Sequence, residues 1–210
     1  MKIFLGKEAD KFLAGLPVAK SQLCNDSGEV VKCAKRFHFP VVLKIISGQA
    51  IHKTDIGGIK VAKDYAELRN SYLELMRLSR DKRIKLDGIL VQEHTKGTEV
   101  IIGIKKDATF GHVIMFGIGG TMVELLKDVS FRVCPINEND AESMIGELKF
   151  NKLLYGFRGS KPVNFKLLKS ILVKVSKIPS RHKKIEELDI NPLMISGNTA
   201  KIVDARVVVG

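Results

Sequence analysis

The chain has 210 residues, of which 45% are hydrophobic and 28% are charged, and this composition excludes a wholly disordered protein. No apolar run approaches the roughly 20 residues that span a bilayer, and residues 3–5 are too short for the core of a signal peptide. We therefore expect a soluble, cytoplasmic protein with no membrane partner. The 35 basic and 23 acidic residues give a net charge of +12, which is typical of proteins with polyanionic partners. Because the basic residues are spread along the chain, with no Trp and only 6% aromatic residues, we expect no nucleic-acid partner.

Helices and strands are expected to alternate along the chain. Residues 7–14 have a helical pattern, and Asp26 and Glu29 have the spacing of a capping box at the start of a helix that ends near Phe37. Residues 40–46 are predicted to form a buried strand and 59–62 a short strand, and Asp64 is expected to cap a long helix. Further strands are expected at 88–93, 99–105 and 112–116 and within 122–133, further helices from Asn137 or Asn139 to about 149 and at 163–178, and a hairpin at 185–209. This mixture predicts an α/β mixed (α+β) fold with two lobes, and not a doubly wound parallel sheet.

The cysteines are three in number, Cys24, Cys33 and Cys134, and none belongs to a CxxC pair. The odd number and the spacing support neither a disulfide framework nor a zinc site. We expect them to be small buried side chains in a reducing cytoplasm.

Lys44 lies within the apolar strand Val-Val-Leu-Lys-Ile-Ile, where a buried charge requires a partner. Two interpretations are comparably strong: an edge-strand lysine whose stem reaches water, or a lysine that binds a nucleotide phosphate. In the loop that follows, the pair Gly57 and Gly58 lets backbone N–H groups approach anionic oxygens closely. His52 lies in the same loop, and a histidine can be a hydrogen-bond donor, a general base or the nucleophile that accepts a phosphoryl group.

The C-terminal hairpin is predicted to bring three polar residues together. If Gly197-Asn198 is a two-residue turn, Asn191 and Asp204 are direct cross-strand partners with Cβ atoms about 5 Å apart. Asp189 lies two residues before Asn191 and therefore on the same face. Two carboxylates and an amide carbonyl form a set of hard oxygen ligands that suits Mg²⁺. A bulge at Pro192 would shift the register and move Asp204 to the other face, and an ordinary surface hairpin is the simpler alternative.

Two glutamates lie near strand ends in the middle of the chain. Glu93 ends the apolar strand at 88–93, and Glu99 begins the next strand. Either carboxylate could accept a hydrogen bond from a ribose hydroxyl, although a solvated acid at a strand end is the simpler interpretation.

Three segments, taken together, resemble a known family. They read PVVLKIISGQAIHKTDIGGIKV, LVQEHTKGTEVIIGIKKDATFGHVIMFGIGGTMVELLKDVSFRVCPI, and IEELDINPL followed by VDARVVV. They resemble the β subunit of ADP-forming acetyl-CoA synthetase, an ATP-grasp protein related to the β subunit of succinyl-CoA synthetase. The resemblance extends from Glu8 to Val209. Gly48 stands where the family usually has proline, and the scarcity of acidic residues between about 150 and 185 also departs from the usual subunit.

The resemblance implies a two-lobed ATP-grasp fold formed by residues 1–210 as one domain, with lobes at about 21–92 and about 1–20 plus 93–210. It implies an acid–CoA ligase reaction in which acyl-CoA, ADP and phosphate interconvert reversibly with a free acid, CoA and ATP, with Mg²⁺ as cofactor. A partner CoA-binding α subunit would supply the CoA site, most of the acyl site and a first phosphohistidine.

Site residues follow from the same resemblance. His52 would be the catalytic residue that passes the phosphoryl group to ADP, and Lys44 would contact nucleotide phosphate. The other implied nucleotide-binding residues are Gly57, Gly58, Val91, Glu93 and Glu99, and the implied metal ligands are Asp189, Asn191 and Asp204.

Two other functions would place different demands on the chain. Another ATP-grasp carboxylate ligase would need its own acyl and amine sites, for which the chain has little spare length, and it would have no use for a nucleophilic His52. A basic RNA-binding module would bind RNA with steeply salt-dependent affinity and would not bind Mg-ATP.

Overall fold

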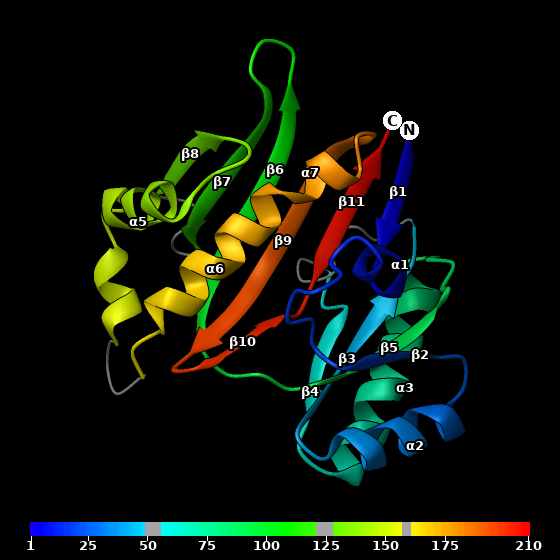
Figure 1. The fold of residues 1–210 in the computed structure, drawn as a ribbon. Coiled ribbons are helices and arrows are strands. Elements are labelled where there is room, and N and C mark those ends of the chain that lie inside the picture. The colour runs from blue at the N-terminus through cyan, green and yellow to red at the C-terminus, as the bar shows by residue number, and fades with distance from the viewer. Residues whose placement is uncertain (49–55, 121–127, 157–160) are drawn as a thin grey trace. The chain divides into compact units, whose positions relative to one another are not determined.

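The computed structural model describes residues 1–48, 56–120, 128–156 and 161–210 (Figure 1). The chain forms two compact units. The smaller unit is Ala19–His94, and the larger unit combines Met1–Val18 with Thr95–Gly210. No helix in the described ranges is both long and apolar enough to cross a membrane.

A four-stranded antiparallel sheet with the strand order β2-β5-β3-β4 forms the centre of the smaller unit. One face of this sheet is covered by two helices, whose apolar side chains bury Leu43, Ile45 and Val91. The strands are β2 (Ser21–Cys24), β3 (Val41–Ile46), β4 (Ile59–Ala62) and β5 (Gly88–Glu93), and the helices are α2 (Ser27–Phe37) and α3 (Tyr65–Asp81).

Both helices of the smaller unit begin where the sequence predicts. The Asp26 carboxylate accepts a hydrogen bond from the N–H of Glu29 at 2.9 Å, and the Asp64 carboxylate accepts one from the N–H of Glu67 at 2.8 Å. The carboxylates of Glu29 and Glu67 in turn accept from the backbone N–H group that precedes each cap, at 2.8 Å. These bonds satisfy N–H groups that would otherwise have no partner at a helix start.

In the described part of the larger unit, a seven-stranded antiparallel sheet has the order β1-β11-β9-β6-β7-β8, with β10 also paired to β9. Its strands are β1 (Lys2–Leu5), β6 (Thr98–Asp107), β7 (Gly111–Ile118), β8 (Val129–Val133), β9 (Ile185–Ser196), β10 (Thr199–Ile202) and β11 (Ala205–Val209).

Helices cover one face of this larger sheet. Leu168 and Leu172 of α6 pack there with Ile102 of β6 and with Leu188 and Ile190 of β9. The helical elements are α1 (Lys7–Asp10), α5 (Glu138–Glu147), the 3-10 helix η1 (Asn151–Tyr155), α6 (Phe165–Ser176) and α7 (Ile178–Arg181). The first helix ends earlier than the predicted 7–14, because the backbone continues only as single turns after Asp10. Strands β1 and β2 were not predicted.

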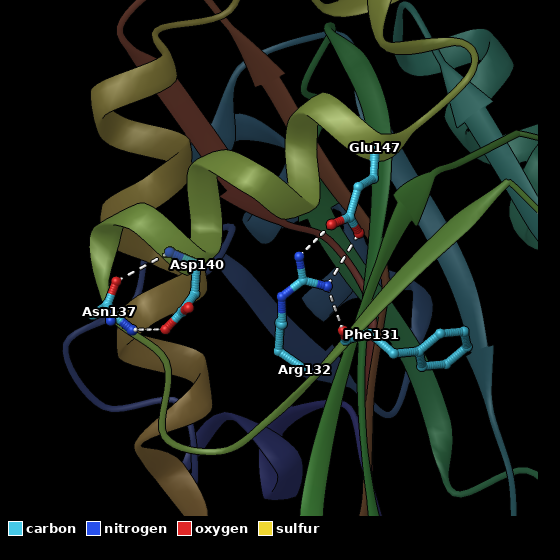
Figure 2. Close-up of polar contacts among 5 residues, drawn as sticks. All are labelled: Phe131, Arg132, Asn137, Asp140 and Glu147. Atoms are coloured by element: carbon cyan, nitrogen blue, oxygen red, sulfur yellow. Dashed lines mark hydrogen bonds and ion pairs between the residues drawn. The ribbon is translucent and has the colours of Figure 1, made fainter.

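Polar contacts attach α5 to the neighbouring strand (Figure 2). Of the two predicted caps, Asn137 is the one used: its side chain accepts from the N–H of Asp140 at 3.0 Å, and the Asp140 carboxylate accepts from the N–H of Asn137 at 2.9 Å. At the other end of the helix, the guanidinium of Arg132 on β8 binds both carboxylate oxygens of Glu147. This ion pair lowers the pKa of Glu147 and raises that of Arg132.

Asp128 fixes the start of β8 from the inside. Asp128 is only 6% exposed, and its two carboxylate oxygens accept from the backbone N–H groups of Lys149 and Phe150, both at 2.9 Å. One buried side chain therefore joins β8 to the segment that follows α5.

The cysteines are free thiols. Cys24 and Cys33 lie buried in the core of the smaller unit with their sulfur atoms 3.3 Å apart, as expected for small core side chains. Burial, followed by the hydrogen bond with Cys33, raises the pKa of Cys24 to about 12. Cys134 is partly buried, and burial raises its pKa to about 11.

Candidate functional site

The C-terminal hairpin has the register that the turn predicts. Ile202 lies opposite Leu193, and Ala205 lies opposite Ile190. Between these two pairs, the N–H of Asn191 donates to the carbonyl oxygen of Asp204 at 3.2 Å. Asn191 and Asp204 are therefore cross-strand neighbours.

The possible bulge at Pro192 does occur, but it changes the pairing of β9 with β6 and leaves the pairing within the hairpin unchanged. Val100 pairs with Leu193, whereas Ile102 pairs with Ile190, so β9 has one residue more than β6 over this stretch. Because the two arms of the hairpin keep their mutual register, they shift together, and Asp204 stays on the same face as Asn191.

Asp189 completes the predicted ligand set on that face. Ile190 and Ala205 are buried in the core beneath the helices, so the alternation of side chains directs Asp189, Asn191 and Asp204 to the opposite face of the sheet. Asp189 lies opposite Gly103 on one side and Arg206 on the other. The guanidinium of Arg206 binds the carboxylate of Glu187 at 2.5 Å.

The donor set on this face suits a hard cation in chemical type. Two carboxylates and one amide oxygen are ligands that Mg²⁺ accepts, with water completing its coordination. Among the described residues, no cluster of three or more His, Cys, Asp or Glu side chains could hold a metal. A metal bound here would therefore need the amide of Asn191 as well as the two carboxylates.

Glu99 lies on the same face of the sheet, beside the glycines that follow β7. The N–H of Gly119 donates to the carbonyl oxygen of Glu99 at 2.7 Å. A Cβ on Gly119 would lie only 3.1 Å from the Cβ of Glu99, and one on Gly120 would lie 3.9 Å from its carboxylate. Glycine at 119 therefore permits this close approach, and the carboxylate of Glu99 lies beside the loop.

In the smaller unit, Lys44 occupies a central strand. β3 is paired on both sides, with Lys44 opposite Ile59 of β4 and Leu90 of β5, and the residue is 4% exposed. The interpretation of Lys44 as an edge-strand lysine is therefore wrong. Its side chain points to the face of the sheet opposite α2 and α3, because Leu43 and Ile45 point into the core beneath those helices.

Gln92 shares that face with Lys44, although no motif in the sequence points to it. It lies opposite Val42 on β3, one step diagonally from Lys44, and is 3% exposed. Strand alternation relative to Leu90 would have placed it there, but an isolated glutamine gives no signal by itself.

The other two predicted nucleotide-binding residues of β5 have different surroundings. Val91 is fully buried in the core beneath the helices, so only its backbone could contact a ligand. Glu93 alternates to the same side as Val91, and its carboxylate accepts from the N–H of Lys20 at 2.8 Å. The roles implied for both residues stay predictions.

Gly57 and Gly58, which precede β4, shape the backbone at the start of that strand. Gly57 has a φ of +74°, which favours glycine, and the carbonyl oxygen of Gly58 accepts from the N–H of Ile45 at 3.0 Å. His52, the predicted phosphoryl carrier, lies outside the described residues.

Comparison with known proteins agrees with this fold. Residues 3–209 match the model of a family described as an ATP-grasp domain. The β subunit of acetate–CoA ligase (ADP-forming) I of Pyrococcus furiosus is 42% identical over 200 residues, which cover 93% of this chain and 86% of that subunit. The chain therefore belongs to the ATP-grasp family, in the group that contains the β subunits of ADP-forming acetate–CoA ligases.

Some relatives are longer. The 4-hydroxybutyrate–CoA ligase (ADP-forming) of Nitrosopumilus maritimus is 41% identical over 199 residues, which cover 92% of this chain but 28% of that protein. The chain thus spans less than a third of that ligase.

Among solved structures, the acetyl-coenzyme A synthetase 1 of Ca. Korarchaeum cryptofilum, in complex with coenzyme A, Ca-AMPCP and HgCl⁺, matches with a TM-score of 0.94 and 42% identity, covering all of this chain and 94% of the other. A second structure of that synthetase holds coenzyme A and Mg-AMPPCP, with a phosphohistidine segment pointing towards the nucleotide binding site. Its TM-score is 0.85 at 42% identity, and the match covers 100% of this chain and 93% of that one.

Proposed function

We propose that this chain is the nucleotide-binding subunit or domain of a cytoplasmic ADP-forming acyl-CoA synthetase. In the direction of ATP synthesis, acyl-CoA and phosphate give a free acid, CoA and a phosphohistidine, and the phosphoryl group then passes to ADP. The observation that carries the proposal is the match over 86% of a separate β subunit of acetate–CoA ligase (ADP-forming). A partner with a CoA site would supply the thioester chemistry.

His52 is the proposed carrier of the phosphoryl group in this chain. An imidazole nitrogen can attack phosphorus and hold the group as a phosphoramidate, which is reactive enough to transfer to ADP. During that transfer the N–P bond breaks and a bond forms between phosphorus and a terminal oxygen of ADP.

Lys44 is the proposed phosphate ligand of the smaller unit. Its buried position on a central strand reduces screening by water, so its ammonium group would interact strongly with a nucleotide phosphate. Gln92 on the same face adds a neutral amide that can donate to an oxygen or accept from an amino group. Gly57 and Gly58 are proposed to contribute through their backbone.

Asp189, Asn191 and Asp204 are the proposed holders of Mg²⁺ in the larger unit, and Glu99 is proposed to contact the nucleotide. When bound, Mg²⁺ would neutralise charge on the phosphate oxygens. The hairpin register supports the grouping, because Asn191 lies opposite Asp204.

Labelling tests the carrier role directly. Incubation of the chain with γ-labelled Mg-ATP should place acid-labile, alkali-stable label on the peptide that contains His52, and added ADP should discharge it. His52→Ala should abolish both the label and phosphate exchange between acyl-CoA and ADP. Substantial ATP formation by His52→Ala with its partner present would overturn the proposal.

His182→Ala is the matched control. His182 lies on the larger unit with its ring 5.2 Å from that of Phe12, and it belongs to no proposed ligand set. Labelling should persist in this variant. Loss of a hydrogen bond alone at His52 would slow exchange by about 10- to 100-fold, so complete loss distinguishes a covalent carrier from a hydrogen-bond donor.

A further inference from the structure

The positive charge of the chain is concentrated in one segment, although its basic residues are not. Residues 148–185 contain 11 lysines and arginines and no aspartate or glutamate. The rest of the chain has 24 basic and 23 acidic residues, so nearly the whole net charge of +12 comes from this segment. The segment includes η1, α6 and α7 of the larger unit.

Four of these cations form a line on the outer surface of the two helices. Leu168, Leu172 and Val175 of α6 are buried against the sheet. Lys166, Lys174, Lys177 and Arg181 follow one another at intervals of eight, three and four residues, which places them on the opposite side of a helix with 3.6 residues per turn. All four are exposed. We call these four residues the basic stripe.

The stripe continues from one helix to the next. Lys177 ends α6 with helical φ and ψ angles and directly precedes α7, and α7 follows the direction of α6 (Figure 1). The 15 residue steps from Lys166 to Arg181 correspond to about 22 Å of helix. In the part of the chain that the structure describes, none of the four stripe residues forms an ion pair with an acidic side chain, whereas Lys169, beside the stripe, binds Glu142 at 3.2 Å.

An exposed aromatic ring lies at the start of the stripe. Tyr155 is 63% exposed, and its ring packs against that of Phe165, the first residue of α6, with centroids 4.7 Å apart. The ring is therefore held at the start of α6 by Phe165, the residue before Lys166, and still presents surface to solvent. Phe150 is 39% exposed in the same acid-free segment.

Contrary to the expectation drawn from the even spread of basic residues, the absence of acidic residues from this segment points to a nucleic-acid partner: we propose that the basic stripe and Tyr155 form a binding surface for single-stranded nucleic acid. Lysine side chains spaced along a helix neutralise backbone phosphates, and an exposed ring offers a base a stacking surface. This activity is separate from the proposed ligase function, because α6 covers the face of the sheet opposite to that of Asp189 and Asn191.

A docking surface for an acidic protein fits the stripe less well. The centres of protein interfaces are depleted in lysine and enriched in aromatic and other large apolar side chains. Three of the four stripe residues are lysines, and no large apolar side chain is exposed within α6 or α7. These features fit better a partner that binds mainly through its negative charge and stacks a base on the ring at one end of the stripe.

The test is a fluorescence anisotropy titration of a labelled 20-nucleotide oligouridylate with the full chain, between 50 and 200 mM salt. Binding in the range of about 1–100 µM is expected, with log K falling as log salt rises, by about 0.7 for each phosphate neutralised. Lys174→Gln/Lys177→Gln should therefore reduce the slope by about 1.4. Tyr155→Leu should weaken binding by about tenfold through lost stacking and leave the slope unchanged.

The matched control is Lys32→Gln/Lys35→Gln, which removes two exposed lysines from α2 of the smaller unit. It should leave both affinity and slope unchanged. Saturating Mg-ATP should not displace the oligonucleotide.

Three outcomes would overturn the proposal. The first is an absence of binding at 50 mM salt with 100 µM protein, and the second is an equal loss of affinity in the two double variants. The third is displacement of the oligonucleotide by Mg-ATP or, at equal charge concentration, by a 20-residue polyglutamate, because either result assigns the binding to another site or another class of partner. Thermal melting of each variant confirms that it is folded.

Discussion

The backbone N–H of Asn191 donates to the carbonyl oxygen of Asp204 at 3.2 Å, although 12 residues separate the two in sequence. The bond holds two polar side chains side by side on the face of the sheet that α6 does not cover. The extra residue of β9 relative to β6 leaves this pair intact, because the two arms of the hairpin keep their register with each other.

If Asp204 is a metal ligand, Asp204→Asn removes one of two anionic ligands from the set. We expect the Mg²⁺ concentration needed for half-maximal ATP formation to rise by tenfold or more, because a charged ligand is replaced by a neutral one. The measurement is a Mg²⁺ titration of turnover with the partner present. Asp107→Asn, which changes an exposed carboxylate in the turn between β6 and β7, should behave as the unchanged protein does. Normal activity of Asp204→Asn at limiting Mg²⁺ would contradict the assignment.

Lys44→Met tests the phosphate ligand of the smaller unit. Loss of a charge-assisted contact should weaken ADP binding by about tenfold or more. The control is Lys60→Met on the adjacent strand: Lys60 lies opposite Leu43, so its side chain points to the helix-covered face, where it pairs with Glu74. Calorimetric titration with Mg-ADP measures both variants, and Lys44→Arg keeps the charge in case Lys44→Met does not fold. Equal ADP affinities of Lys44→Met and Lys60→Met would show that Lys44 does not bind the nucleotide phosphate.

Asp128→Ala should destabilise the larger unit. Two backbone N–H groups, those of Lys149 and Phe150, would lose their acceptor in a buried position, at a cost of about 2–4 kcal/mol in the free energy of unfolding. Asp107→Ala removes the same number of backbone hydrogen bonds at an exposed turn, where water replaces the carboxylate, so its effect should be smaller. Urea denaturation of both variants checks the difference. Similar losses would mean that burial adds nothing to the role of Asp128.

The thiols should react in the order of their exposure. A pKa of about 12 leaves Cys24 with about a thousandfold less thiolate at pH 8 than a thiol of pKa 9, and burial also blocks access. The partly exposed Cys134, with a pKa of about 11, should react first, although slowly. A thiol reagent at pH 8 followed by peptide mapping gives the order, and all three thiols should react rapidly in 6 M guanidinium chloride. Rapid labelling of Cys24 in the folded chain would contradict its buried position.

The same pKa shift also gives a dependence of stability on pH. Because the folded state holds the proton of Cys24 to about pH 12 and an unfolded thiol loses it near pH 8.5–9, unfolding releases a proton in this interval. This contribution to stability is complete below about pH 8.5 and is lost as the pH rises towards 12. Urea denaturation at pH 8 and pH 10 should show a smaller loss of stability for Cys24→Ala than for the unchanged chain. An identical loss would assign the alkaline effect to other groups.

Local chemistry in the sequence determined the helix starts and the register of the hairpin. Asp26, Asp64 and Asn137 cap helices through bonds to N–H groups a few residues away, so a short window of sequence contains the whole interaction. The two-residue turn at Gly197-Asn198 likewise sets the pairing of Asn191 with Asp204, because each later pair follows from the turn. The sequence alone therefore predicts that Asn191 and Asp204, two of the three proposed metal ligands, lie opposite each other.

Only the tertiary structure decided the surroundings of the other candidates. Lys44 lies on a central strand because β5 and β4 flank β3, and β5 lies more than 40 residues away in sequence. Strand β1 forms against β11 at the far end of the chain, and four residues give no pattern that could predict it. The carboxylate of Asp128 meets N–H groups 21 and 22 residues away. Short sequence windows contain one partner of each such contact, whereas folding selects the other by the burial and hydrogen bonding of the whole unit.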